Sequence, residues 1–223
     1  MFRIKVCGIT SVDDGRMAAE AGAEAVGLNF YARSKRHVTP KLAQQIAAAM
    51  PPEVVRVGVF VNEKVDTIRQ LVDTVGLDMI QLHGDEPARF VTELAAGCSM
   101  PVIRAFRLGP DGAPPIVAYV QRCLAADCPI RMILIDAYSQ GDYGGTGKKA
   151  DWLAVRELPR EGLPPLILAG GLTPENVALA IETTRPAAVD TAGGVESTPG
   201  RKDPRRVRAF VEAARAALGG DSP

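Results

Sequence analysis

The sequence lacks the features that mark several large classes of protein. It has no excess of charge, because 26 Lys and Arg residues balance 26 Asp and Glu residues. A neutral chain gives no electrostatic reason to expect nucleic acid or an anionic membrane as a partner. No apolar run reaches the ~20 residues that span a bilayer, and the first apolar stretch is too short for the core of a signal peptide. We therefore expect a cytoplasmic protein with no nucleic-acid or membrane partner.

Cysteine and histidine are also scarce, with four and two residues respectively. The cysteines form no C-x-x-C pair, and the histidines lie far from them in sequence, so we expect no zinc or other metal site. Three cysteines are interpreted as small buried hydrophobic residues: Cys98, Cys123 and Cys128. The fourth, Cys7, has a different position, which is considered below.

What the sequence does contain is an alternation of short, β-rich apolar runs with longer stretches at helical spacing. Most of the runs have no polar face, which is typical of parallel strands covered on both sides. Strict alternation of strand and helix implies right-handed crossovers. Eight units within 223 residues predict a single (β/α)8 TIM barrel, with residues 1–223 as one domain. The expected strands are Arg3–Cys7, Glu24–Phe30, Val54–Val61, Met79–Leu82, Pro101–Phe106, Met132–Asp136, Leu166–Ala169 and Ala188–Asp190.

Capping patterns predict where several helices begin. A Thr or Asp before proline caps a helix whose first turn accepts the proline, and this occurs at Thr39-Pro40, Thr173-Pro174 and Asp203-Pro204. Ser11 followed by Asp14 resembles a capping box with the shorter acid.

One connection is long and rich in glycine. The run Tyr138–Lys149 follows the sixth expected strand, and long loops at this end of a barrel are where sites are built. Its segment Gly144–Lys148 reads GGTGK, which lacks the spacing and the following helix of a P-loop. We therefore reject a nucleoside triphosphate site and expect a loop that grips substrate.

The carboxyl ends of barrel strands face the substrate, so polar residues there are candidates for chemistry. Cys7 ends the first strand, and its thiol suits a base or nucleophile if its pKa is lowered. Asp136 ends the sixth, where a carboxyl is costly unless it is hydrogen-bonded or functional. A packed core cysteine and a loop-pinning or helix-capping aspartate are the structural alternatives, and the residues alone leave both open. Together they are suited to serve a small substrate as base and acid.

Two glycine pairs follow the last two strands. Gly170 and Gly171 follow the seventh strand, and Gly193 and Gly194 follow the eighth. Glycine lets backbone N–H groups approach a phosphate closely, and a helix N-terminus adds partial positive charge. Two tight turns are the structural alternative, but adjacent pairs at this place match the usual phosphate site of a barrel.

Four further polar residues belong to the same expected mouth. Arg36 is suited to a bidentate pair with a substrate carboxylate, and a solvated basic loop is the alternative. Gln81 and His83 end the fourth strand, where His83 is either a substrate contact or a hydrogen-bonding wall residue. Asp190 lies beside the expected phosphate loop, and because a phosphate would repel it, we expect it to orient the backbone or a substrate hydroxyl.

Seven stretches together resemble the phosphoribosylanthranilate isomerase family, in order and over almost the whole chain. They are KVCGIT at 5–10, GLNFYARSKRHV at 27–38, VGVFVN at 57–62, QLHGDE at 81–86, GGTGKKADW at 144–152, LAGGLTPENV at 168–177 and VDTAGGVESTPGRKD at 189–203. The resemblance implies a small phosphoribosyl substrate and an Amadori-type aldose-to-ketose rearrangement without cofactor or metal. It leaves monomer and homodimer equally open.

The resemblance also implies roles for individual residues. Cys7 would be the general base that removes the sugar C2 proton, and Asp136 the general acid that protonates the ring oxygen. Arg36 would engage the anthranilate carboxylate, and the glycine-rich loops would hold the phosphate. Because the acid must be protonated while the base is not, their surroundings must act in opposite directions. We hypothesise that charge and hydrogen bonding at the mouth favour the Cys7 thiolate.

Two residues depart from the family pattern. Gly193 stands where the family usually has Ser, which removes a hydroxyl contact to the phosphate but keeps the backbone donor. Ala150 stands where the family often has Phe, so packing of the loop after the sixth strand is expected to differ. Neither departure touches the expected acid or base.

Two alternative functions remain. One is the related barrel isomerase of histidine biosynthesis, which carries two similar half-barrels and an Asp as base, whereas the first strand here ends in Cys7. The other is a barrel that binds a phosphorylated ligand without turnover, for which Cys7 and Asp136 would be dispensable.

Overall fold

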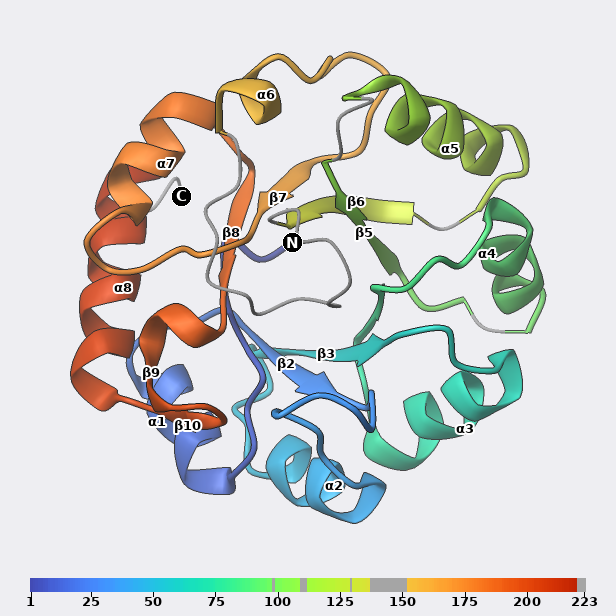
Figure 1. The fold of residues 1–223 in the computed structure, drawn as a ribbon. Helices are drawn as coiled ribbons and strands as arrows, with labels where there is room; N and C mark the ends of the chain where they lie inside the picture. The colour runs from blue at the N-terminus through green and yellow to red at the C-terminus, as the bar shows by residue number, and fades with distance from the viewer. Residues whose placement is uncertain (98, 109–111, 129, 137–151, 220–223) are drawn as a thin grey trace.

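The computed structural model describes residues 1–97, 99–108, 112–128, 130–136 and 152–219. Eight parallel strands form a closed barrel in sequential order, with helices arranged around it (Figure 1). The strands are β1 (Ile4–Cys7), β2 (Ala25–Asn29), β3 (Val55–Phe60), β4 (Met79–Leu82), β5 (Val102–Arg107), β6 (Ile130–Asp136), β7 (Leu166–Leu168) and β8 (Ala188–Thr191). The helices are α1 (Val12–Glu20), α2 (Pro40–Ala48), α3 (Val65–Val75), α4 (Ala88–Ala95), α5 (Pro114–Ala125), α6 (Trp152–Arg156), α7 (Val177–Thr184) and α8 (Pro204–Ala217).

The barrel closes through parallel pairing of the first and last strands. Lys5 on β1 lies in register with Ala25 on β2 and, on the other side, with Asp190 on β8. The predicted fold class is therefore confirmed, and each predicted strand overlaps one observed strand, with boundaries that differ by at most two residues. The repeated apolar runs sufficed for this prediction because a strand buried on both faces leaves a continuous apolar signal.

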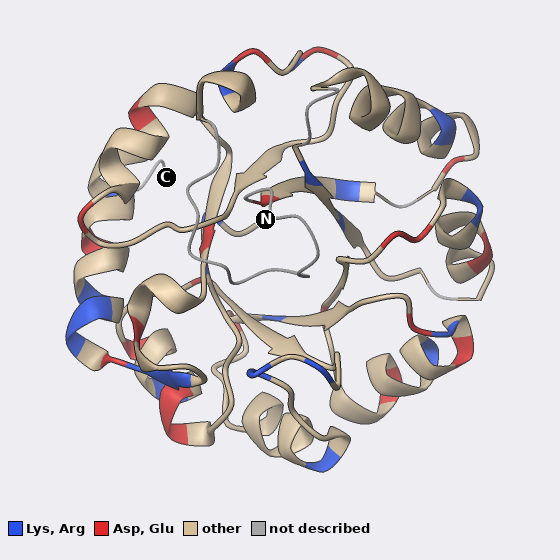
Figure 2. Ribbon diagram, in the orientation of Figure 1, with Lys and Arg blue, Asp and Glu red and all other residues tan. Residues whose placement is uncertain are grey.

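The core has two layers, as the barrel architecture requires. One cluster combines strand residues with the inner faces of the surrounding helices. The other lies inside the barrel and consists of residues from the strands and their immediate ends: Phe2, Ala25, Val57, Met79, Ile103, Ala105, Met132, Leu134, Ile167, Ala169 and Ala188. Charged residues gather mainly on the outer helices and loops (Figure 2). Charged groups inside the barrel therefore need specific partners.

The capping patterns predicted the first residues of α2 and α8 correctly, whereas α7 begins later than predicted. Thr39 accepts a hydrogen bond from Leu42 N–H, and Asp203 accepts from the N–H groups of the first turn of α8. Regular helix α7 begins only at Val177, because Asn176 Oδ1 accepts from Thr173 N–H at 2.8 Å and folds the preceding residues into a separate turn.

A short antiparallel hairpin between β8 and α8 was not predicted. Its strands are β9 (Glu196–Thr198) and β10 (Arg201–Lys202), and a 3-10 turn at Gly193–Val195 precedes them. The backbone N–H of Lys202 donates to Asp14 Oδ2 at 3.2 Å. The Ser11 half of the expected capping box is present, with Ser11 Oγ accepting from Asp14 N–H. The Asp14 carboxylate, by contrast, accepts from the hairpin backbone at Lys202 and so fixes the hairpin to α1.

Several other expectations concern burial and composition. Cys123 and Cys128 are buried, as predicted, whereas Cys98, Ala150 and the segment Tyr138–Lys149 lie outside the described residues. Within the described ranges, no helix is both long enough and apolar enough to cross a membrane. The same part of the chain holds no group of three or more His, Cys, Asp or Glu side chains arranged for a metal ion.

A buried arginine holds the loop after β4. Arg104 on β5 donates through Nη1 to the carbonyl oxygens of Leu82 and Ala105, at 2.9 and 2.6 Å. Its Nη2 donates to Gly84 O at 3.0 Å. Glu86 Oε2 lies 3.5 Å from Nη1 and is itself buried. Because a guanidinium carries five donors in a fixed fork, one side chain can bind several carbonyls of one loop.

We predict that Arg104→Met lowers the free energy of unfolding by about 3–5 kcal/mol, because the buried Glu86 carboxylate then loses the cation that faces it and keeps only its backbone donors. Urea denaturation measures the loss. The matched control is Arg56→Met, which breaks the more exposed pair of Arg56 and Asp78 and should cost no more than about 1 kcal/mol. Equal losses in the two variants would contradict the role given to Arg104.

Candidate active site

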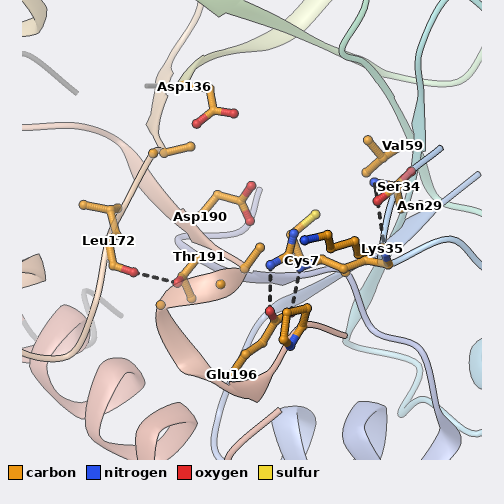
Figure 3. A pocket seen from close by; sticks show the side chains of 18 of the residues that line it. Cys7, Asn29, Ser34, Lys35, Val59, Asp136, Leu172, Asp190, Thr191 and Glu196 are labelled. Carbon is orange, nitrogen blue, oxygen red and sulfur yellow. Dashed lines mark hydrogen bonds and ion pairs between the residues drawn. The ribbon is translucent and has the colours of Figure 1, made fainter. Parts of the chain in front are cut away.

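The described residues form a cavity of ≈ 940 Å³ at the carboxyl ends of the strands. This volume is typical of small-molecule sites. All ten residues predicted for the site line it: Cys7, Arg36, Gln81, His83, Asp136, Gly170, Gly171, Asp190, Gly193 and Gly194. Cys7, Asp136 and Asp190 reach the same space from β1, β6 and β8 (Figure 3).

Cys7 is packed closely at the end of β1. It lies opposite Gly27 on β2, where a Cβ atom would come within 2.5 Å of the Cys7 Sγ. Glycine at this position therefore makes room for the thiol. Burial raises the pKa of the Cys7 thiol, and the nearby Lys5 ammonium lowers it by less. The charges of Lys5 and Lys202 favour the thiolate, as hypothesised, but burial outweighs them and holds the pKa of Cys7 above its ordinary value.

Lys5 does not line the cavity but pairs with Asp190, which does, and the sequence reasoning missed it. Its side chain is completely buried inside the barrel, and Nζ donates to Asp190 Oδ1 at 3.0 Å. Burial raises the pKa of Asp190; the Lys5 charge opposes this, and the charge of Asp136 adds to it. A lysine within the apolar run FRIKVC, two residues before Cys7 and hence on the same face of the strand, was the available signal.

His83 contacts the proposed acid directly. His83 Nε2 lies 3.2 Å from Asp136 Oδ2, and Nδ1 lies 2.8 Å from Gln81 Nε2. With the Gln81 amide donating to Nδ1, the ring carries its proton on Nε2 and donates it toward Asp136. These hydrogen bonds link β4 to the end of β6 and fit both expectations for His83, a hydrogen-bonding wall residue and a substrate contact.

Arg36 is engaged by a carboxylate of the protein itself. Its Nε and Nη2 donate to the two oxygens of Glu196 at 2.7 and 2.6 Å. The Lys202 ammonium donates to Glu196 Oε1 at 2.9 Å and to Ala192 O at 3.0 Å. Burial by itself raises the pKa of Glu196, but the hydrogen bonds from Arg36 and Lys202 outweigh it and hold that pKa below its ordinary value.

This pairing changes what Arg36 can offer to a ligand. Two of its five N–H donors bind Glu196, so a second carboxylate has the remaining three. A Cβ atom at Gly193 would lie 3.1 Å from Arg36 Nη2, so the glycine that departs from the family pattern leaves room for this pair. Sequence reasoning missed Glu196 and Lys202 because both belong to the unpredicted hairpin.

The two glycine pairs lie together at the rim. Gly170 and Gly171 adopt φ values of 91° and 65°, which favour glycine. A Cβ atom at Gly194 would overlap the carbonyl oxygen of Leu172. Thr191 Oγ1 donates to that same oxygen at 2.8 Å. The loops after β7 and β8 are therefore in direct contact, which only a residue without a side chain at Gly194 permits.

Arg206 brings a positive charge to this rim. It belongs to the first turn of α8, lines the cavity, and donates through Nε to Gly194 O at 3.0 Å. Backbone N–H groups with a nearby cation form an anion-binding cradle. We call residues 170–173 and 192–194 together with Arg206 the anion cradle.

The chain is similar to one family over nearly its whole length. The profile of the family described as N-(5′phosphoribosyl)anthranilate (PRA) isomerase matches residues 4–213. The N-(5′-phosphoribosyl)anthranilate isomerase of Geobacter sulfurreducens is 45% identical over 216 residues, which are 96% of this chain and 99% of that protein.

Solved structures agree with this similarity. A phosphoribosyl anthranilate isomerase in complex with reduced 1-(o-carboxyphenylamino)-1-deoxyribulose 5-phosphate has a TM-score of 0.79 at 37% identity, covering 97% of this chain and 100% of that one. Monomers generated from the dimeric isomerase of Thermotoga maritima give a TM-score of 0.79 at 36% identity, with the same coverage.

We predict that Gly194→Ala weakens phosphate binding, because the added methyl group forces apart the loops that form the anion cradle. Loss of one hydrogen bond to a charged ligand is worth about 1.5–3 kcal/mol, so the Kd for inorganic phosphate should rise by about 10–100-fold. Isothermal titration calorimetry measures it. Gly162→Ala is the control: it lies outside the cavity and nothing is within 4 Å of a Cβ atom there, so it adds only the backbone strain of a φ of 74° and should keep its Kd. An unchanged Kd in Gly194→Ala would rule out this cradle.

Proposed function

The chain belongs to the N-(5′-phosphoribosyl)anthranilate isomerase family, and from this membership we propose how its own residues carry out the reaction. The enzyme converts N-(5-phosphoribosyl)anthranilate to 1-(2-carboxyphenylamino)-1-deoxyribulose 5-phosphate in tryptophan biosynthesis. The reaction is an internal redox rearrangement of an aldose to a ketose. Because the chain belongs to this family, we set aside the two alternatives, the histidine-pathway isomerase and the non-catalytic barrel.

The chemistry needs one acid and one base. Ring opening requires a proton donor at the furanose oxygen and leaves a cationic imine. That imine acidifies the neighbouring C2–H bond, so a base of moderate strength suffices to remove the proton. Such acid–base steps by positioned side chains contribute about 10²–10⁴-fold each to the rate.

Cys7 is the general base and Asp136 the general acid. The observation that carries this assignment is that both side chains line one cavity, from β1 and β6, with the anion cradle on the same rim. A substrate anchored by its phosphate at the cradle spans the space between them. His83 Nε2, at 3.2 Å from Asp136 Oδ2, donates its N–H to the carboxyl and orients it.

The remaining predicted residues bind the substrate. The anion cradle takes the phosphate. The free N–H donors of Arg36 engage the anthranilate carboxylate while Glu196 fixes the guanidinium. Gln81, His83 and Asp190 contact the sugar from the floor of the cavity.

The ligand class, oligomeric state, cellular location and domain organisation are proposed only in general terms. The ligand is a small phosphoribosyl compound, and either a monomer or a homodimer accommodates the site. The Thermotoga maritima relative is described as dimeric, with monomers generated from it. We keep a cytoplasmic location and a single domain over residues 1–223 as proposals.

We predict that Cys7→Ala and Asp136→Asn each lower kcat by about 10²–10⁴-fold with the fold intact, the usual worth of general acid–base catalysis. Purified protein is mixed with freshly made phosphoribosylanthranilate, and the loss of anthranilate-type fluorescence is followed. Circular dichroism confirms folding. Cys123→Ala, which removes a cysteine buried in the outer core, is the control and should keep its kcat. Near-native turnover by Cys7→Ala would exclude the proposed base.

A further inference from the structure

The side chain of Arg36 is held by the protein at both its stem and its head. The aliphatic stem lies against Gly8, where an added Cβ atom would overlap Arg36 Cδ. The guanidinium is fixed by Glu196, which accepts from Nε at 2.7 Å and from Nη2 at 2.6 Å. A side chain that is fixed before a ligand arrives loses little rotamer freedom on binding, so Arg36 is preorganised.

Glu196 occupies one edge of the guanidinium and leaves another for a ligand. The planar group has two edges on which a pair of N–H bonds can bind one carboxylate, Nε with Nη2 and Nη1 with Nη2. Glu196 takes the first edge, and Arg36 lines the cavity. The second edge is therefore the one on which a substrate carboxylate can accept two parallel hydrogen bonds. Its direction is set by Glu196.

Lys202 is a second cation in the same cluster, and the acid–base scheme above does not use it. Its side chain is completely buried, and that of Glu196 nearly so. Lys202 Nζ donates at 2.9 Å to Glu196 Oε1, the oxygen that also accepts from Arg36 Nε, and at 3.0 Å to Ala192 O. The cluster thus holds one carboxylate between two cations.

Charge balance gives the second cation a role. Glu196 neutralises Arg36, so a substrate carboxylate at Arg36 would meet a neutral pair and the like charge of Glu196. With Lys202 present, two cations face two carboxylates once the substrate is bound. Burial lowers the pKa of Lys202, and the charge and hydrogen bond of Glu196 oppose this. A substrate carboxylate adds to that opposition, so its binding favours the ammonium.

We propose that Glu196 and Lys202 set the selectivity of this enzyme for a substrate whose aromatic amine carries an ortho carboxylate. Glu196 directs the free edge of Arg36, so that only a carboxylate at the right ring position meets both donors. Lys202 supplies the positive charge that this carboxylate balances. Both are positioning residues, since they act through Arg36. The inference rests on the proposed function, because it takes N-(5-phosphoribosyl)anthranilate as the substrate.

The test compares three substrates that differ only in the carboxylate. Ribose 5-phosphate is condensed freshly with anthranilate, 3-aminobenzoate or aniline, and each rearranged product is quantified by liquid chromatography and mass spectrometry. The ratio of kcat/KM for the anthranilate compound to that for the aniline compound reports the preference for charge. The ratio of the anthranilate compound to the 3-aminobenzoate compound reports the preference for position. A loss that affects all three substrates equally leaves both ratios unchanged.

Lys202→Met should lower the preference for charge by about tenfold or more, since the substrate carboxylate then faces Glu196 with only one cation between them. The loss should appear as a higher KM for the anthranilate compound, with kcat changed by less than about threefold, as expected for a contact made equally in the ground and transition states. The preference for position should remain, because Glu196 still holds Arg36. Lys202→Arg keeps the cation and should recover part of the preference for charge.

Glu196→Gln should have the complementary effect. The amide offers Arg36 one oxygen in place of two, so the guanidinium gains freedom and the preference for position falls by about 3–10-fold, the worth of ordering one long side chain. The preference for charge should not fall, because the substrate carboxylate no longer faces a like charge. Arg201→Met is the matched control, since it removes an exposed cation from the same hairpin. It should leave both ratios unchanged.

Two outcomes would overturn the selectivity role. Equal losses on all three substrates in both variants would mean that the cluster only packs the hairpin, and unchanged ratios in variants that circular dichroism shows to be folded would mean that it does not act on Arg36. If Lys202→Met does not fold, the preference for position in Glu196→Gln decides alone. A wild type that fails to turn over phosphoribosylanthranilate refutes the proposed function, whereas normal turnover with unaltered ratios in the variants refutes only this inference.

Discussion

The parallel pairing of β1 with β8 closes the barrel, and the contacts in the cavity depend on it. This pairing sets Lys5 beside Asp190, although the two residues are 185 positions apart in sequence. It also brings the loop after β8 next to the end of β1, so the anion cradle and Cys7 share a rim. Without closure, a buried ammonium on β1 would have no carboxylate, and the apolar interior could not tolerate it.

Burial and charge oppose each other throughout this cavity. Desolvation disfavours every charged form, so it raises the pKa values of the Cys7 thiol and the Asp190 carboxyl. Nearby cations lower these pKa values, but by different amounts from one residue to another. In Glu196 the two cations prevail and its pKa falls. At Cys7 the Lys5 ammonium, which also pairs with Asp190, does not outweigh burial, so the pKa of the thiol stays above its ordinary value.

The hairpin between β8 and α8 shows how a short segment completes a site. It supplies Glu196 and Lys202, which fix the Arg36 guanidinium, and it is held in turn by Asp14 at the start of α1. The residue that departs from the family pattern, Gly193, lies where a side chain would approach this pair. A side chain at that position would therefore require the Arg36 guanidinium to shift slightly.

The sequence alone determined the barrel, because strands buried on both faces leave continuous apolar runs. It also determined which residues lie at the rim, because those residues follow directly after each apolar run. It therefore predicted Cys7, Asp136 and both glycine pairs. Only the tertiary structure decided which side chains meet: Arg36 with Glu196, 160 positions away, and Lys5 with Asp190. Such pairings depend on strand register and loop path, and these are settled by packing of the whole chain and not by any local pattern.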